Sequence, residues 1–153
     1  MKSTLAALFA AVVFSAAAHA ADRPAMVIQV SDADPATLNI ALVNAKNLQA
    51  AYAERGGVDL EIVVYGPAVR LLASDSEYAE RIAATVAAGV PIVACRNTMS
   101  AMKLEPADMN ARIGYVPVGA GEILERQRQG WAYLRTGSSA QPPSRPLPTR
   151  WMT

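Results

Sequence analysis

The chain is best understood from ten residues near its middle, Gly89-Val90-Pro91-Ile92-Val93-Ala94-Cys95-Arg96-Asn97-Thr98. Glycine commonly follows the end of a helix, and the apolar run after it is typical of a short, buried β-strand. The run ends at Cys95, the only cysteine in the sequence. Asn97 or Thr98 is expected to cap a short helix, because both residue types are preferred at helix N-caps. The stretch therefore predicts a thiol at the junction between a buried strand and a helix.

Segments on either side of this stretch repeat the alternation of strand and helix. Strands are expected over residues 26–30, 59–65, 91–95, 112–116 and 131–135. Helices are expected over residues 35–54, 76–88 and 122–129. A helical turn is expected at 68–72, and the short helix capped by Asn97 or Thr98 is expected to end at residue 102. Asp34 is a good N-cap for the first long helix, and Ser74 with Glu77 has the pattern of a capping box before the second. Strands that alternate with helices about every 30 residues predict a mainly parallel sheet with helices on both faces.

The first twenty residues have the features of a secretory signal peptide. Lys2 provides the positive start, residues 5–18 form an apolar run, and Ala18-His19-Ala20 matches a small-x-small cleavage site. A membrane anchor is the weaker interpretation, because the run is shorter than the roughly 20 residues that a spanning helix needs. We expect an exported, periplasmic protein with no membrane span after cleavage, one domain over residues 21–135, and a disordered tail rich in proline and serine over 136–153.

Composition argues against several classes of function. The net charge is +1 and falls to zero once Lys2 is removed, so no electrostatic attraction to nucleic acid or anionic lipid is expected. The only histidine, His19, leaves with the signal peptide, which removes any histidine-based catalytic site or metal site, and no cofactor is indicated. A lone cysteine in an exported protein is a reactive thiol, an intermolecular bridge or a buried bystander.

Cys95 is the strongest candidate for chemistry. Ligands of open α/β sheets bind at the carboxyl ends of the strands, where loops 31–34, 66–67, 95–98 and 117–121 are expected. If a helix begins just after Cys95, its backbone N–H groups point toward the sulfur and favour the thiolate, and Arg96 adds a positive charge nearby. The opposing interpretation is a small, inert cysteine that ends a buried strand. Position alone does not decide between the two.

Three other patterns give weaker signals. Asp32 and Asp34 form a DxD pair after the first strand, as in haloacid-dehalogenase-like phosphatases, but no acidic pair on a later strand completes a magnesium site, so Asp34 is better explained as a helix cap. Residues 119–121, Gly-Ala-Gly, could cradle an anion but are better explained as a tight turn before a helix. Asn44 and Asn47, on one face of the first helix, could contact a neighbouring loop or subunit or be solvated.

Five segments, taken in order, form a larger pattern: residues 44–48 (NAKNL), 64–72 (VYGPAVRLL), 89–98 (GVPIVACRNT), 116–124 (VPVGAGEIL) and 129–134 (QGWAYL). Together they resemble the DsrE/DsrF-like family, specifically its small exported or single-domain members. The resemblance covers nearly all of residues 26–135. It implies a three-layer α/β/α fold with a mainly parallel five-stranded sheet, and assembly into homo-oligomers, trimers or hexamers.

The same resemblance implies a function. Characterised relatives pass sulfur between proteins as a cysteine persulfide, and Cys95 matches a cysteine position of the family. We therefore expect a sulfur-binding or sulfurtransferase-like protein that works with a sulfur donor or acceptor protein. Cys95 is its expected catalytic residue, and Gly66, Asn97 and Thr98 are its expected substrate-binding residues. The alternative is a non-enzymatic oligomeric binding or scaffold protein in which Cys95 is merely packed.

Overall fold

The structure, a computed structural model, describes residues 23–137. The predicted signal peptide and residues 138–153 of the predicted tail lie outside the described residues. Five strands form one sheet in the order β4-β3-β2-β1-β5, and every neighbouring pair is parallel. The strands are β1 (Ala25–Val30), β2 (Asp59–Val64), β3 (Ile92–Cys95), β4 (Gly114–Val116) and β5 (Ala132–Thr136). The predicted α/β fold with a parallel five-stranded sheet is confirmed.

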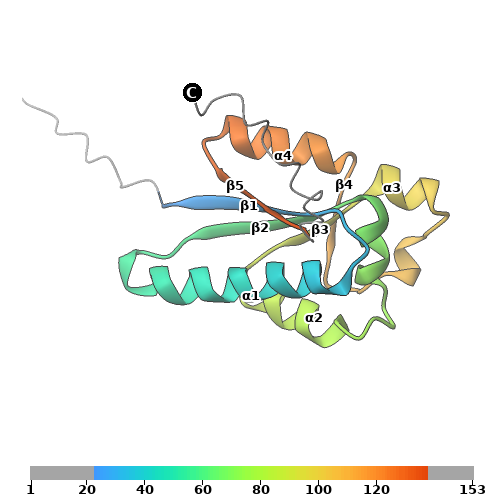
Figure 1. Cartoon of the computed structure of the whole chain (residues 1–153), viewed down its shortest axis with the longest axis horizontal. Coiled ribbons are helices and arrows are strands. Elements are labelled where there is room, and N and C mark those ends of the chain that lie inside the picture. Colours follow the sequence, from blue (N-terminus) through green and yellow to red (C-terminus); the bar gives the residue numbers. More distant parts are fainter. Residues whose placement is uncertain (1–22, 138–153) are drawn as a thin grey trace, which may run out of the picture.

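Helices cover both faces of this sheet (Figure 1). The α-helices are α1 (Pro35–Tyr52), α2 (Ala79–Ala87), α3 (Arg96–Ala101) and α4 (Gly119–Arg128), and the 3₁₀ helices are η1 (Ala53–Arg55), η2 (Gly66–Leu72) and η3 (Pro106–Asp108). Helices α1 and α2 lie on one face and α4 on the other, while α3 lies beside η2 near the edge where the strands end. No helix within residues 23–137 is both long and apolar enough to cross a bilayer.

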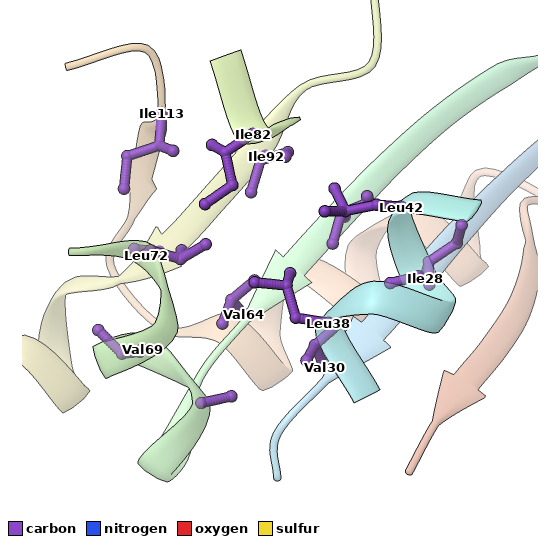
Figure 2. Close-up of a cluster of buried hydrophobic side chains, with 14 of the residues drawn as sticks. Ile28, Val30, Leu38, Leu42, Val64, Val69, Leu72, Ile82, Ile92 and Ile113 are labelled. Carbon is purple, nitrogen blue, oxygen red and sulfur yellow. The ribbon is translucent and has the colours of Figure 1, made fainter. Parts of the chain in front are cut away.

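Alternating strand residues divide the core into two clusters. Ile28 and Ile92 point to the α1 side of the sheet and belong to the larger cluster, which Figure 2 shows. Val27 and Val93, one residue away in each pair, belong to a smaller cluster under α4. Because successive strand side chains point to opposite faces, a strand buried on both sides reads as a continuous apolar run. This explains why β1, β2 and β3 were predicted to within one residue at each end.

Helix α1 begins at Pro35 as predicted and ends at Tyr52, two residues before the predicted end, where η1 follows it. The carboxylate of Asp34 accepts a hydrogen bond of 2.9 Å from the backbone N–H two residues later, and Pro35 occupies the first turn. Leu38 and Leu42 pack into the larger cluster (Figure 2). Gly56, just after η1, has a φ of 91°, a left-handed conformation that glycine adopts without a steric penalty.

Helix α2 begins at Ala79, three residues later than predicted. The predicted capping box of Ser74 and Glu77 is wrong, because the N–H of Ser74 donates to the carbonyl of Asp108 at 2.9 Å and so ties this residue to η3. The hydroxyl of Ser76 instead accepts a hydrogen bond of 3.2 Å from the backbone N–H two residues later. A contact between distant segments has therefore overridden a local helix signal.

Candidate functional site

Loops that follow the parallel strands meet at one edge of the sheet, as expected for an open α/β fold. The N–H of Gly66, after β2, donates to the hydroxyl of Thr98 in α3 at 3.1 Å. The sulfur of Cys95, at the end of β3, lies 3.9 Å from the carbonyl oxygen of Pro117, after β4. Ser31, after β1, also lies close to Gly66. A Cβ added to Gly66 would be 3.3 Å from the carbonyl oxygen of Ser31. All four of the predicted loops thus contribute to this edge.

Cys95 occupies the junction between β3 and α3. It lies on the same face of the sheet as Val93, two residues earlier, which is the face that α4 covers. The thiol is free and the residue is 4 % exposed. Two residues close to it in the structure, Asn97 and Pro117, are exposed.

The predicted N-cap of α3 is wrong in one detail. Helix α3 begins at Arg96, so Cys95 itself is the N-cap, and Asn97 and Thr98 lie in the first turn. No side chain caps this helix, and the N–H of Asn97 donates to the carbonyl of Pro117 at 3.2 Å. A backbone acceptor from the loop after β4 thus satisfies one of the free N–H groups that a capping side chain normally binds. Asn97 contributes its backbone to the site, while its side chain is exposed.

Hydrogen bonds around Cys95 favour the thiolate. Burial raises the pKa of the thiol, but hydrogen bonds from the hydroxyl of Thr98 and from the backbone N–H groups of Gly119, Thr98 and Asn97 lower it. The hydrogen bonds outweigh burial, so the pKa of Cys95 lies below its ordinary value. A thiolate is the nucleophilic form of cysteine, so this arrangement can support attack by the sulfur.

Sequence reasoning missed Gly119 as a donor to the sulfur. Residues 119–121 do not form the predicted turn, because they are the first residues of α4. Gly119 is buried, and a Cβ added to it would lie 2.9 Å from the Cβ of Tyr65. Glycine is thus required for the close approach of α4 to Tyr65, and the N–H of Gly119 at this position helps to lower the pKa of Cys95. Gly119 and Gly121, which follow β4 after two intervening residues, were the available signal.

The weaker sequence candidates have structural roles or lie elsewhere. Asp34 caps α1, and its N–H lies 3.4 Å from a carboxylate oxygen of Asp32, so the pair organises the turn before this helix. Within residues 23–137, no group of three or more His, Cys, Asp or Glu residues is arranged to hold a metal ion. Asn44 and Asn47 line an open groove of about 340 Å³ between α1 and Leu134 of β5. The site at the sheet edge does not include them.

Comparison with known proteins extends these observations. The model of the DsrE/DsrF-like family matches residues 9–136. The chain is similar to MTH1491 of Methanobacterium thermoautotrophicum, a solved structure described as a protein of unknown function. The two are 31% identical with a TM-score of 0.68, and the match covers 73% of this chain and 98% of that one. No curated protein sequence gives a significant match.

Two further solved structures are similar at lower identity. BT1422 of Bacteroides thetaiotaomicron, described as a conserved protein of unknown function, is 20% identical with a TM-score of 0.59, and the match covers 72% of this chain and 93% of that one. The YchN protein of E. coli is 12% identical with a TM-score of 0.58, and the match covers 74% of this chain and 98% of that one. At these identities the likeness shows the shared fold.

Proposed function

Because the chain belongs to the DsrE/DsrF-like family, which is associated with sulfur relay, we propose that it binds sulfur and transfers it as a persulfide on Cys95. The surroundings of the Cys95 sulfur are the observation that supports this role most strongly. Burial raises the pKa of its thiol, but the Thr98 hydroxyl and the backbone N–H groups of Gly119, Thr98 and Asn97 lower it by more. A cysteine that only fills space needs apolar neighbours and no such donors.

The proposed transfer needs no external oxidant or reductant. The thiolate of Cys95 attacks the outer sulfur of a donor persulfide or polysulfide, a new S–S bond forms, and the donor's own S–S bond breaks. The donor leaves as a thiolate or a shortened polysulfide with the electron pair of the broken bond. In the delivery step an acceptor thiolate attacks the outer sulfur, and Cys95 leaves as a thiolate. Hydrogen-bond donors that stabilise the Cys95 thiolate assist it both as the nucleophile and as the leaving group.

The proposal includes a location and partners. The signal-peptide features of residues 1–20 support export to the periplasm. The chain has one cysteine, so a second cysteine of the relay belongs to a donor or acceptor protein. We also propose assembly into a trimer or hexamer, to which Ile40 and Val43, 44 % and 40 % exposed on α1, could contribute an apolar contact. Light scattering on the purified protein tests the assembly, and a monomer at micromolar concentration would contradict it.

Mass spectrometry tests the persulfide directly. After incubation with polysulfide, the native protein is expected to gain one sulfur atom, about 32 Da, on Cys95. The Cys95→Ser variant is the matched control and should gain nothing. If the wild-type protein takes up no sulfur and its thiol reacts with alkylating reagents only in denaturant, the scaffold alternative replaces the proposal.

A further inference from the structure

We propose that the side chain of Tyr65 covers the Cys95 sulfur and selects the sulfur compounds that reach it. It admits the narrow end of a polysulfide or persulfide and excludes bulky disulfides. This inference rests on the proposed function, because it names the shape of the donor that Cys95 accepts. It adds a specificity-determining residue that the family match does not assign.

Tyr65 lies beside Cys95 on the same face of the sheet. In the parallel pairing of β2 with β3, Val64 is opposite Ala94. The next residues along the two chains are therefore Tyr65 and Cys95, and Tyr65 is still extended, with φ −147° and ψ 179°. Neighbouring strands are about 4.8 Å apart, and successive side chains point to opposite faces. Both side chains therefore project from the face that α4 covers, where Tyr65 packs against the smaller cluster.

The segment between β4 and α4 borders both side chains. The sulfur of Cys95 is 3.9 Å from the carbonyl oxygen of Pro117. Two residues later, a Cβ added to Gly119 would be 2.9 Å from the Cβ of Tyr65 and 3.1 Å from its Cδ1. The sulfur and the base of the tyrosine ring therefore lie against the same three residues, 117–119. These distances agree with the strand register and place the ring next to the thiol.

The ring of Tyr65 extends from this position to the surface, and the residue as a whole is half-buried. Within residues 23–137 its hydroxyl has no hydrogen-bond partner, and no side-chain oxygen or nitrogen without a partner is buried. The hydroxyl of Tyr65 is therefore in contact with solvent. Packing alone holds the ring, so its displacement breaks no hydrogen bond of the side chain.

The other sides of the sulfur are closed by less mobile groups. On β4 the residue paired with Cys95 is Val116, which is 8 % exposed and belongs to the smaller cluster. Pro117 presents its backbone to the sulfur, and α4 begins two residues later. Cys95 itself is 4 % exposed. The half-buried ring of Tyr65 is therefore the side chain whose displacement opens a route from solvent to the sulfur.

A route opened by one side chain is narrow, and this favours one class of donor. The outer sulfur of a polysulfide or persulfide is the end of a chain, so it can approach the thiolate without a bulky group attached. In an ordinary disulfide the attacked sulfur bears a carbon substituent, which must enter the route with it. The bonds that form and break are those of the proposed transfer. Tyr65 thus selects among donors by width.

The test compares two thiol reagents of different width on the full chain. Iodoacetamide is small, and dithiodipyridine is a bulky, neutral aromatic disulfide. The ratio of their rate constants with Cys95 measures access, because both reagents need the same thiolate. In Tyr65→Ala the rate constant for dithiodipyridine is expected to rise about tenfold more than that for iodoacetamide, because access limits thiol–disulfide exchange. Tyr65→Phe keeps the ring and should retain the wild-type ratio.

Tyr133→Ala is the matched control. Tyr133 is an exposed tyrosine of β5 that is paired with Val27 and so lies on the same face, but β1 and β2 separate it from Cys95. This variant should keep the wild-type ratio. Tyr65→Leu replaces Tyr65→Ala if that variant fails to fold, because leucine keeps apolar contact with the smaller cluster but is shorter than the ring.

The ratio separates a selective cover from a loosened site. An unchanged ratio in folded Tyr65→Ala or Tyr65→Leu would overturn the role of Tyr65, even if both rate constants rise together. The same change of ratio in Tyr65→Phe or in Tyr133→Ala would also overturn it, because the ring of Tyr65 would then not be the cause.

This assay uses no sulfur donor, so it separates the inference from the proposed function. A changed ratio in a protein that takes up no sulfur from polysulfide would keep Tyr65 as the cover of the thiol and overturn the proposed function. An unchanged ratio in a protein that forms the persulfide would overturn the inference alone.

Discussion

Arg126 of α4 donates hydrogen bonds to both carboxylate oxygens of Glu61, at 2.6 and 3.2 Å, and so joins this helix to the central strand of the sheet. Glu61 is 3 % exposed, and Arg126 also pairs with Glu122 at 2.9 Å and lies 4.7 Å from the ring centroid of Trp131. Because α4 begins with Gly119, whose N–H helps to lower the pKa of Cys95, this ion pair helps to hold part of the site in place.

Replacement of Arg126 by methionine should destabilise the protein. The change leaves the Glu61 carboxylate buried without its partner, which we expect to lower the free energy of unfolding by about 2–3 kcal/mol, less than for a fully buried pair. Urea denaturation measures the loss. The Glu61→Leu/Arg126→Met double variant removes both charges and should recover most of the stability. An Arg126→Met protein as stable as the wild type would show that the pair does not hold α4.

The loss of stability in Arg126→Met should depend on pH. Burial raises the pKa of Glu61 in the folded protein, and Arg126 opposes that rise. A carboxyl group with a raised folded pKa favours the folded state at low pH, and this contribution is lost as the pH rises through the folded pKa. Without Arg126 the rise is larger. The deficit of Arg126→Met should therefore shrink as the pH falls toward the ordinary carboxyl range, and a deficit independent of pH would contradict this explanation.

Cys95 should also make the stability of the fold depend on pH, in the direction opposite to that of Glu61. Burial raises the pKa of its thiol, but the hydrogen bonds of the site lower it by more, so the folded pKa is below the unfolded one. The thiolate then stabilises the fold above the unfolded pKa, and this stabilisation is lost as the pH falls through the folded pKa. Urea denaturation should show a larger gap between wild type and Cys95→Ser at alkaline than at acidic pH. An equal gap at both pH values would be inconsistent with a lowered pKa.

Gly119 and Gly121 provide a matched pair of substitutions in the first turn of α4. A Cβ at Gly119 would lie 2.9 Å from the Cβ of Tyr65, so Gly119→Ala should displace the helix, cost about 1–3 kcal/mol and raise the pKa of Cys95. At Gly121 the nearest atom to a Cβ is 3.6 Å away, so Gly121→Ala should stabilise the helix by about 0.5–1 kcal/mol. Thermal unfolding measures the stability of both variants, and the pH dependence of Cys95 alkylation measures the change in its pKa. Similar effects at the two positions would argue against close packing of Gly119 on Tyr65.

Much of the fold follows from local patterns. Strands that are buried on both faces appear as apolar runs, which is why β1, β2 and β3 could be predicted. Asp34 and Pro35 mark the start of α1 because both favour a helix N-terminus. The starts of the other long helices depend on distant contacts. Ser74 is tied to Asp108 by its backbone, and α4 starts at Gly119 although glycine is a poor helix former.

The candidate site was predictable only in part. Cys95 and Thr98 lie where the end of a strand places them, so a thiol at the sheet edge could be expected from order along the chain, although its reactivity could not. The donor at Gly119 and the bond from Gly66 to Thr98 join segments that are distant in the sequence. These contacts depend on how closely α4 and the loop after β2 approach the sheet edge. Packing of that kind has no local sequence signal.

Sulfur release to cyanide is the most direct test of the central claim, that Cys95 carries transferable sulfur. Cyanide attacks the outer sulfur of a persulfide, leaves as thiocyanate and returns Cys95 as a thiolate. Protein loaded with polysulfide and freed of excess reagent should release one equivalent of thiocyanate per chain, and Cys95→Ser should release none. No thiocyanate from the wild type, or equal amounts from both proteins, would contradict the account.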